Sequence, residues 1–248
     1  MAQDYGKIQS AQRTMQLLEL LAAHSGQLSV TQIAKLMDVS IASVSRLLAT
    51  LSELGYVEKN AETHRYSLSY RLYALGSRSV SSNALVRALI PVANSVARKY
   101  DVSVNINSMA GRDAVLLWRV TRFFNKDLDF IGGETAPAYC TSAGKAMLST
   151  YSEDRLADYL SHIDLSGVQN KHITEATLRE ELSQVAKRGY SVCPEEYVSG
   201  VFSISFPLRD RTGGVFAFTV ITRMNDVARI TSEAVLRDIS SRLPALIK

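Results

Sequence analysis

The chain has 248 residues, of which 46% are hydrophobic and 21% are charged, and its formal net charge is +4. This balance is typical of a globular chain of one or two domains, and a membrane span is excluded because no apolar run reaches the required ~18 residues. Residues 1–5 lack a basic segment followed by an apolar core, so we expect no secretory signal and a cytoplasmic location without membrane contact.

Three short amphipathic helices are predicted near the N-terminus. Ser10 is expected to cap the first of them, and Ser29 to cap the second. The inward stripe of the first is Thr14, Leu17, Leu18 and Leu21. After a tight turn at residues 38–40, the third helix continues until Gly55 stops it. Its inward residues are Val44, Leu47, Leu48 and Leu51.

Two β-prone runs follow the third helix, at residues 56–59 and 65–68, and they flank a polar tip at 60–64. This arrangement predicts a hairpin. Three short helices followed by a hairpin indicate a winged helix-turn-helix, whose third helix lies in the major groove of double-stranded DNA.

The predicted third helix has an outer face suited to DNA. Opposite its apolar stripe lie Ala42, Arg46, Ala49 and Glu53, flanked by Ser43, Ser45 and Thr50. Small and hydroxyl side chains let a helix sink into the groove, whereas a solvated bundle helix, the alternative, carries more Lys and Glu. Arg46 is expected to bind guanine O6/N7 or a phosphate, and the hydroxyls to position the helix on the backbone.

Further basic residues are candidates for phosphate or minor-groove contacts, although each alone also fits an ordinary surface charge. They are His64, Lys59 and Arg65 on the wing, and Arg13, which we expect just before the first helix. The predicted DNA-binding residues are Arg13, Ala42, Ser43, Ser45, Arg46, Thr50, Lys59 and Arg65.

The remaining sequence predicts a linker helix at 70–80 and then an α+β domain. A helix at 84–100 tolerates Pro91 at a kink or turn, and the domain boundary is expected near residue 83, giving domains 1–83 and 84–248. Further helices are expected at 142–150, 153–162, 174–188 and 232–247. Strands are expected at 102–108, 114–120, 128–131, 201–208 and 215–222. Because these strands and helices do not alternate as regular βαβ units, the pattern favours an antiparallel sheet with helices.

Several segments resemble the isocitrate lyase regulator (IclR) family of bacterial transcription factors. They include residues 28–34, 43–51, 54–57, 65–68, 72–76, 137–146, 189–190, 195–196 and 200–201. The resemblance extends from about residue 10 to 246. It implies a C-terminal domain similar to GAF/PAS-like sensors that binds small organic acids or related metabolites. The chain departs from the family at Ser40-Ile41, where the family usually has Pro-Lys, and at His64, where it usually has Gly.

The resemblance and the strand pattern together suggest an effector site. If Ser203 opposes Val220, then Ser203, Ser205, Val220 and Thr222 share one face of a hairpin, which suits a polar ligand; the alternative is that these hydroxyls face solvent. The resemblance places Ala143 and Gly144 beside them, where backbone N–H groups can hold a carboxylate. Cys193 stands where the family commonly has an acidic residue. The predicted effector-binding residues are Ala143, Gly144, Cys193, Ser203, Ser205, Val220 and Thr222.

Catalytic and metal-binding patterns are weak, so we expect no enzyme activity, cofactor or metal. The segment 142–145 resembles the end of a P-loop but lacks the earlier Gly, because Tyr139 occupies that position. Glu195 and Glu196 are adjacent on an extended segment and point oppositely, which favours structural roles. The loop residues His162, Asp164 and His172 fit no tight metal pattern. Cys140 and Cys193 are expected to be free thiols.

The sequence therefore predicts a transcription regulator that binds operator DNA and a small-molecule effector, with repression or activation left open. One recognition helix reads too few base pairs for specificity, so a dimer is expected, with the linker-helix residues Leu72, Tyr73 and Leu75 in contact. The resemblance to the family also implies a tetramer. Two alternatives stay open: a winged helix fused to a metabolite-processing enzyme domain, and an interaction module with a vestigial helix-turn-helix.

Overall fold

The computed structural model describes residues 8–24, 27–123, 132–165 and 173–243. The chain divides into two compact units, Met1–Val80 and Ser81–Lys248. The division falls three residues before the expected boundary at 83. In the described segments, no helix is both long enough and apolar enough to cross a membrane.

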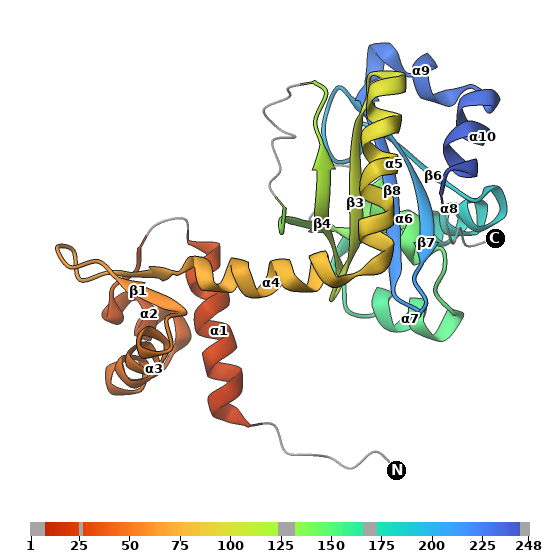
Figure 1. Ribbon diagram of the computed structural model, residues 1–248. Coiled ribbons are helices and arrows are strands. Elements are labelled where there is room, and N and C mark those ends of the chain that lie inside the picture. Colours follow the sequence, from red (N-terminus) through yellow and green to blue (C-terminus); the bar gives the residue numbers. More distant parts are fainter. Residues whose placement is uncertain (1–7, 25–26, 124–131, 166–172, 244–248) are drawn as a thin grey trace. The chain divides into compact units, whose positions relative to one another are not determined.

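The first unit is a winged helix-turn-helix, as the sequence predicts. It contains α1 (Gln9–Ala23), α2 (Val30–Met37), α3 (Ile41–Glu53), β1 (Val57–Lys59) and β2 (Tyr66–Leu68), with β1 and β2 antiparallel (Figure 1). Its core consists of Leu17, Leu21, Leu28, Ile33, Ala34, Val44, Leu48, Leu51 and Val57. The inward stripes of the first and third predicted helices supply much of this core, together with Ile33 and Ala34 of α2. Leu36, expected to face inward on the second helix, is instead exposed.

Of the two helix caps predicted in this unit, one is confirmed and the other is wrong. Ser29 caps α2 in a reciprocal capping box with Gln32, as expected. Ser10 does not cap α1, because the Gln12 N–H already bonds to the Ile8 carbonyl at 3.1 Å and the helix begins at Gln9. The Ser10 carbonyl instead accepts from the Thr14 hydroxyl at 2.8 Å.

The linker helix α4 (Tyr70–Ser82) is anchored at its start by Ser69. The Ser69 hydroxyl donates to the Gly55 carbonyl at 2.5 Å, and its backbone N–H donates to Tyr56. The Arg71 guanidinium lies 5.1 Å from the centre of the Tyr56 ring. No residue of α4 is buried, which leaves a largely uncovered helix at the end of the unit.

The second unit is built on a six-stranded antiparallel sheet in the order β5-β4-β3-β8-β7-β6. These strands are β3 (Ser103–Ala110), β4 (Asp113–Val120), β5 (Thr135–Pro137), β6 (Ser191–Pro194), β7 (Val201–Arg209) and β8 (Val215–Arg223). The structure thus has the α+β architecture predicted from the sequence. The edge strands β5 and β6 were not predicted, because each has only three or four residues and ends in Pro. The expected strand at 128–131 lies outside the described residues.

Helices lie on both faces of this sheet (Figure 1). On one face lies α5 (Ala84–Tyr100), a continuous helix that includes Pro91 and is capped by the Asn83 side chain. The other face carries α6 (Ser142–Leu148), which packs on β7 and β8. The remaining helices are α7 (Glu153–Leu160), α8 (Glu175–Arg188), α9 (Ala228–Thr231) and α10 (Glu233–Ser241).

The two faces of the sheet differ in chemistry. Facing α5, the β7 residues Phe202, Ile204 and Phe206 are buried, as the alternation of the sequence predicts. Facing α6, the alternate residues are Ser203 and Ser205, with polar neighbours on β3, β6 and β8. Burying a sheet face lined by hydroxyl and amide groups costs free energy unless those groups are bonded, so this face is a candidate surface for a polar ligand.

Candidate functional site

The outer face of α3 is exposed, as the helical wheel predicts. Val44, Leu48 and Leu51 are buried, while Ala42, Ser45, Arg46, Ala49 and Thr50 are exposed. Two of the predicted hydroxyl contacts also have local partners. The Ser43 hydroxyl bonds to Ser40, which caps the helix, and the Thr50 hydroxyl donates to the Arg46 carbonyl at 3.0 Å.

The other basic candidates have different surroundings. Arg13 lies within the second turn of α1, not before the helix as expected, since α1 begins at Gln9. The exposed Arg65 donates to the Gln27 carbonyl at 2.9 Å, so it also holds the wing against the loop before α2. Lys59 lies at the end of β1 with its ammonium 5.7 Å from the centre of the Tyr66 ring.

The geometry of the wing tip favours the Gly that the family usually has where this chain has His64. His64 has a φ of 55°, in the left-handed region that favours glycine. Asn60 supports the turn, because its side-chain oxygen accepts from the N–H groups of Glu62 and Thr63 at 3.0 and 2.8 Å. A side chain therefore stands at the tip where it is sterically least favoured, and it is exposed.

A pocket opens between the polar sheet face and α6. Of the predicted effector-binding residues, Ala143, Cys193 and Ser203 line it. The sheet contributes Asn105, Asn107, Ala114, Leu116, Val201, Thr219 and Ile221 as well. The segments 134–136, 141–142 and 195–198 supply the rest of the wall.

The predicted strand register is wrong by one residue. Ser203 pairs with Ile221, and Ser205 with Thr219. A slip of one residue moves every side chain of a strand to the opposite face, so Val220 and Thr222 point away from the pocket and Thr219 and Ile221 take their places. The described pairing runs to Arg209 and Val215, which leaves a five-residue turn that the residue pattern alone did not determine.

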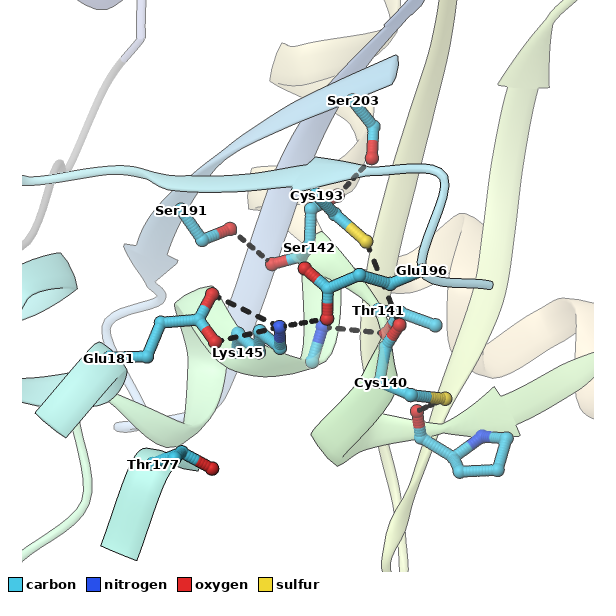
Figure 2. A network of polar contacts seen from close by, with 12 residues as sticks. Cys140, Thr141, Ser142, Lys145, Thr177, Glu181, Ser191, Cys193, Glu196 and Ser203 are labelled. Carbon is cyan, nitrogen blue, oxygen red and sulfur yellow. Dashed lines mark hydrogen bonds and ion pairs between the residues drawn. The ribbon is translucent and has the colours of Figure 1, made fainter. Parts of the chain in front are cut away.

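Ser205 is on the predicted face but is buried in a hydroxyl network beneath the pocket. Its hydroxyl lies 2.8 Å from both the Ser142 and the Thr219 hydroxyls. The Ser142 hydroxyl also contacts Ser203 at 2.8 Å, and the Ser142 carbonyl accepts from the Ser191 hydroxyl (Figure 2). The network ties α6 to three strands, so a ligand that contacts Ser203 is one hydrogen bond away from the start of α6.

Gly144 has a structural role that differs from the predicted one. Its N–H donates to the Thr141 hydroxyl that caps α6, so it is not free to hold a carboxylate. A Cβ at this position would lie 2.0 Å from the Ala138 carbonyl oxygen. Glycine is therefore required for the close approach of α6 to the preceding turn.

The sequence analysis missed a buried ion-pair cluster beside the pocket. Lys145 on α6 is fully buried, and its ammonium pairs with Glu181 on α8 at 2.8 Å and with Glu196 (Figure 2). Burial acts to lower the pKa of Lys145, but the two carboxylates outweigh it and raise that pKa. Lysine is rarely buried without a partner, yet the sequence gives no indication of which acidic residues approach it.

The two thiols are free and buried. Burial raises the pKa of Cys140 to about 11 and that of Cys193 to about 12. The Cys193 thiol donates to the Cys140 carbonyl at 3.7 Å. Because the reactive form of cysteine is the thiolate, neither group is activated as a nucleophile.

The weak catalytic and metal patterns gain no support from the geometry. Glu196 is bound to Lys145, and the Glu195 carboxylate accepts from the Gly200 N–H at 2.6 Å, so both have structural partners. In the described part of the chain no His, Cys, Asp and Glu cluster has the arrangement of a metal site. His172 lies outside the described residues. The fold and the site thus define a DNA-binding domain of winged-helix type joined to a domain with a ligand pocket.

Family models match most of the chain. The IclR helix-turn-helix domain matches residues 10–61, and the bacterial transcriptional regulator IclR C-terminal domain matches residues 77–242. The chain therefore belongs to the IclR family of bacterial transcriptional regulators, as the resemblance implies.

Individual relatives agree with this assignment. The Pca regulon regulatory protein of Pseudomonas putida is 29% identical over 225 residues, which cover 89% of this chain and 76% of that protein. A transcriptional regulator from Rhodococcus sp. RHA1 has a similar structure, with a TM-score of 0.73 and 26% identity over 96% of this chain and 98% of that one. An IclR homologue from Microbacterium hydrocarbonoxydans, complexed with 4-hydroxybenzoate, shares the fold with a TM-score of 0.77 at 15% identity, covering 94% and 97%.

Proposed function

We propose that this regulator binds its operator through the exposed face of α3 and that a small molecule in the polar pocket controls this binding. One observation carries the proposal. The same chain has an exposed face of α3, with small side chains around Arg46, and a pocket in the second unit. An enzyme domain has no comparable support, because Glu195 and Glu196 have structural partners and burial raises the pKa of the Cys193 thiol.

Arg46 is the central residue of the proposed DNA contact. It is exposed on α3 between Ala42 and Ala49, whose small side chains allow the backbone to approach base edges. We expect Arg46→Ala to weaken operator binding by about 1–3 kcal/mol while changing binding to random DNA much less, because a bidentate guanine contact acts only at the specific site. Fluorescence anisotropy on the operator and a scrambled duplex measures both. Equal losses on the two duplexes would show that Arg46 contacts only phosphate.

The uncovered helix α4 is the proposed dimer contact. Tyr70, Tyr73 and Leu75 are 90%, 68% and 58% exposed, and apolar side chains on a surface helix commonly mark an interface. We expect a dimer or larger assembly at micromolar concentration, and conversion to monomer in the double variant Tyr73→Ser/Leu75→Ser. Light scattering gives the mass directly. A wild-type monomer that remains a monomer on DNA rules out this proposal.

Ligand binding is proposed to act by favouring one arrangement of the two compact units. Such a ligand shifts the equilibrium only by its difference in affinity for the two states, typically about 1–3 kcal/mol. Ala143, Cys193 and Ser203 are the proposed ligand contacts retained from the sequence prediction, now joined by Asn105, Thr219 and Ile221. The IclR homologue from Microbacterium binds 4-hydroxybenzoate, which shows that this fold accepts a small organic molecule.

A further inference from the structure

The first turn of α3 carries an apolar side chain that the core of its unit does not use. Ile41 is the first residue of the helix and is 55% exposed. Among the described residues of the first unit, it belongs neither to the buried core nor to the partly buried side chains packed against that core. Val44 and Leu48 on the same helix are fully buried. Ile41 therefore adds little to folding and is free to contact a partner.

The side chains next to Ile41 offer few hydrogen-bond donors. The Ser40 hydroxyl caps the helix by accepting from the Ser43 N–H, and the hydroxyls of these two residues bond to each other at 3.0 Å. Ala42 has no polar atom in its side chain, and residues 40–43 include no charged residue. The exposed start of α3 is therefore mainly an apolar surface formed by Ile41 and Ala42.

This surface lies at the end of α3 that is expected to meet base edges. In helix-turn-helix proteins, the N-terminal residues of the recognition helix make the base contacts. Arg46 lies one turn after Ala42 on the same exposed side. Ile41 and Arg46 are five residues apart, or about 7.5 Å along the helix axis. Successive base pairs are about 3.4 Å apart, so we expect these two side chains at different base pairs.

One group on the base edges of the major groove matches an isoleucine side chain. Guanine, cytosine and adenine present hydrogen-bond donors and acceptors there, whereas thymine presents a C5-methyl group beside its O4 acceptor. An apolar side chain against a donor or an acceptor removes water without replacing the hydrogen bond, which costs free energy. Against the thymine methyl group it removes water from two apolar surfaces, which is favourable.

The competing explanation is that Ile41 is an ordinary apolar residue of the surface, because such residues are common singly on proteins. Leu54, at the C-terminal cap of α3, is one with nearly equal exposure, 51%. It is 13 residues from Ile41, or about 20 Å along the helix axis. Leu54 therefore has the exposure of Ile41 without its position, which makes it a matched control.

We propose that Ile41 determines part of the operator sequence by packing on the C5-methyl group of a thymine, at a base pair separate from the one contacted by Arg46. This inference rests on the proposed function, because it requires α3 to lie in the major groove. It adds a base preference that an arginine does not supply. The operator is then recognised by an apolar contact at the first turn of α3 and a charged contact one turn later.

Replacement of single thymines by deoxyuridine tests the contact without changing the protein. Uracil pairs with adenine as thymine does and lacks the methyl group. The duplex is one that the full chain enriches from a random pool, and each of its thymines is replaced in turn. At one thymine position, the replacement is expected to raise the dissociation constant about fourfold, the effect of one methyl group left unburied. Fluorescence anisotropy measures the change.

Two alanine variants identify the side chain responsible. Ile41→Ala is expected to weaken binding to the thymine duplex and to abolish most of the fourfold difference between thymine and uracil, because the contacting atoms are absent. Leu54→Ala should keep both the affinity and the difference. Arg46→Ala should weaken binding but keep the difference, since it contacts another base pair. The melting temperature of Ile41→Ala should stay close to that of the wild type, because Ile41 is exposed.

The outcomes separate this inference from the proposed function. A duplex that is bound specifically, but whose affinity changes at none of its thymines on replacement, overturns the thymine contact and leaves operator binding by α3 intact. The same conclusion follows if Ile41→Ala keeps the full difference between thymine and uracil. Failure of the chain to enrich any sequence from the pool refutes the proposed function, and this inference with it.

Discussion

Lys145→Met is expected to lower the free energy of unfolding of the second unit by about 3 kcal/mol. The variant keeps the apolar stem but removes the ammonium that neutralises Glu181 and Glu196, whose side chains are 30% and 14% exposed. Loss of one partner of a buried ion pair costs about 3–5 kcal/mol, and the partial exposure of the carboxylates places this case at the lower end. Urea unfolding followed by fluorescence measures it.

A matched control identifies the cause of this loss. Lys187→Met, at an exposed position near the end of α8, is expected to change stability by less than about 0.5 kcal/mol. A deficit that is small at pH 7 contradicts this account.

The ion pairs of Lys145 also make the stability of the wild-type chain depend on pH. The pKa of Lys145 is raised above its usual value of 10.5, so the ion pairs stabilise the fold fully below that value. Their contribution is lost as the pH rises through the raised pKa. The wild type should therefore lose this stabilisation only in strongly alkaline solution.

Gly144→Ala is expected to destabilise the second unit by about 3 kcal/mol or more. The added methyl group would lie 2.0 Å from the Ala138 carbonyl oxygen and 2.3 Å from the Ala138 Cα. Both are backbone atoms, so neither can rotate away, and overpacking a rigid site costs about 1–3 kcal/mol or more. The ligand pocket should deform as well, because Ser142 and Ala143 belong to the same helix start. Thermal unfolding reports the loss of stability, and calorimetric ligand binding reports the change in the pocket.

Gly132→Ala provides the control within the same unit. A Cβ there would meet the Leu117 carbonyl oxygen at 3.8 Å, which is ordinary van der Waals contact. Its stability should change little. If Gly144→Ala matched this control, the close approach of α6 to the Ala138 turn would not be the reason for glycine.

The sequence predicts the DNA-binding unit better than the pocket, for a physical reason. Helical spacing of Val44, Leu48 and Leu51 defines both the buried face of α3 and, by exclusion, its exposed face. The cap at Ser29 follows from a single side chain, although the same signal at Ser10 was wrong. These signals are local, so short-range spacing is enough to identify them.

The pocket depends on contacts between distant segments. Ser203 was identified correctly as a pocket residue, but Thr222 was not, because a one-residue register error reverses a strand. The pairing of Lys145 with Glu181 and Glu196 joins residues separated by 36 and 51 positions. Gly144 was interpreted as a ligand contact, whereas its close approach to Ala138 becomes visible only in the folded chain.

Two hydroxyls on opposite faces of the sheet give a matched pair of variants for testing whether the ligand regulates DNA binding. Ser203 lines the pocket and Thr222 does not, although they lie on neighbouring strands. Ser203→Val should weaken the effect of ligand on operator affinity and leave unliganded DNA binding unchanged. Thr222→Val removes the same kind of group and should preserve both.

The most direct test is the affinity of the full chain for its operator with and without saturating pocket ligand. The operator duplex is identified by footprinting the DNA upstream of its own gene, and anisotropy gives the dissociation constants. We expect the ligand to change operator affinity by about 5–150-fold, and the operator to change ligand affinity by the same factor. A ligand that binds the pocket in a Ser203-dependent manner, yet leaves operator affinity the same, would contradict ligand-controlled DNA binding by this chain.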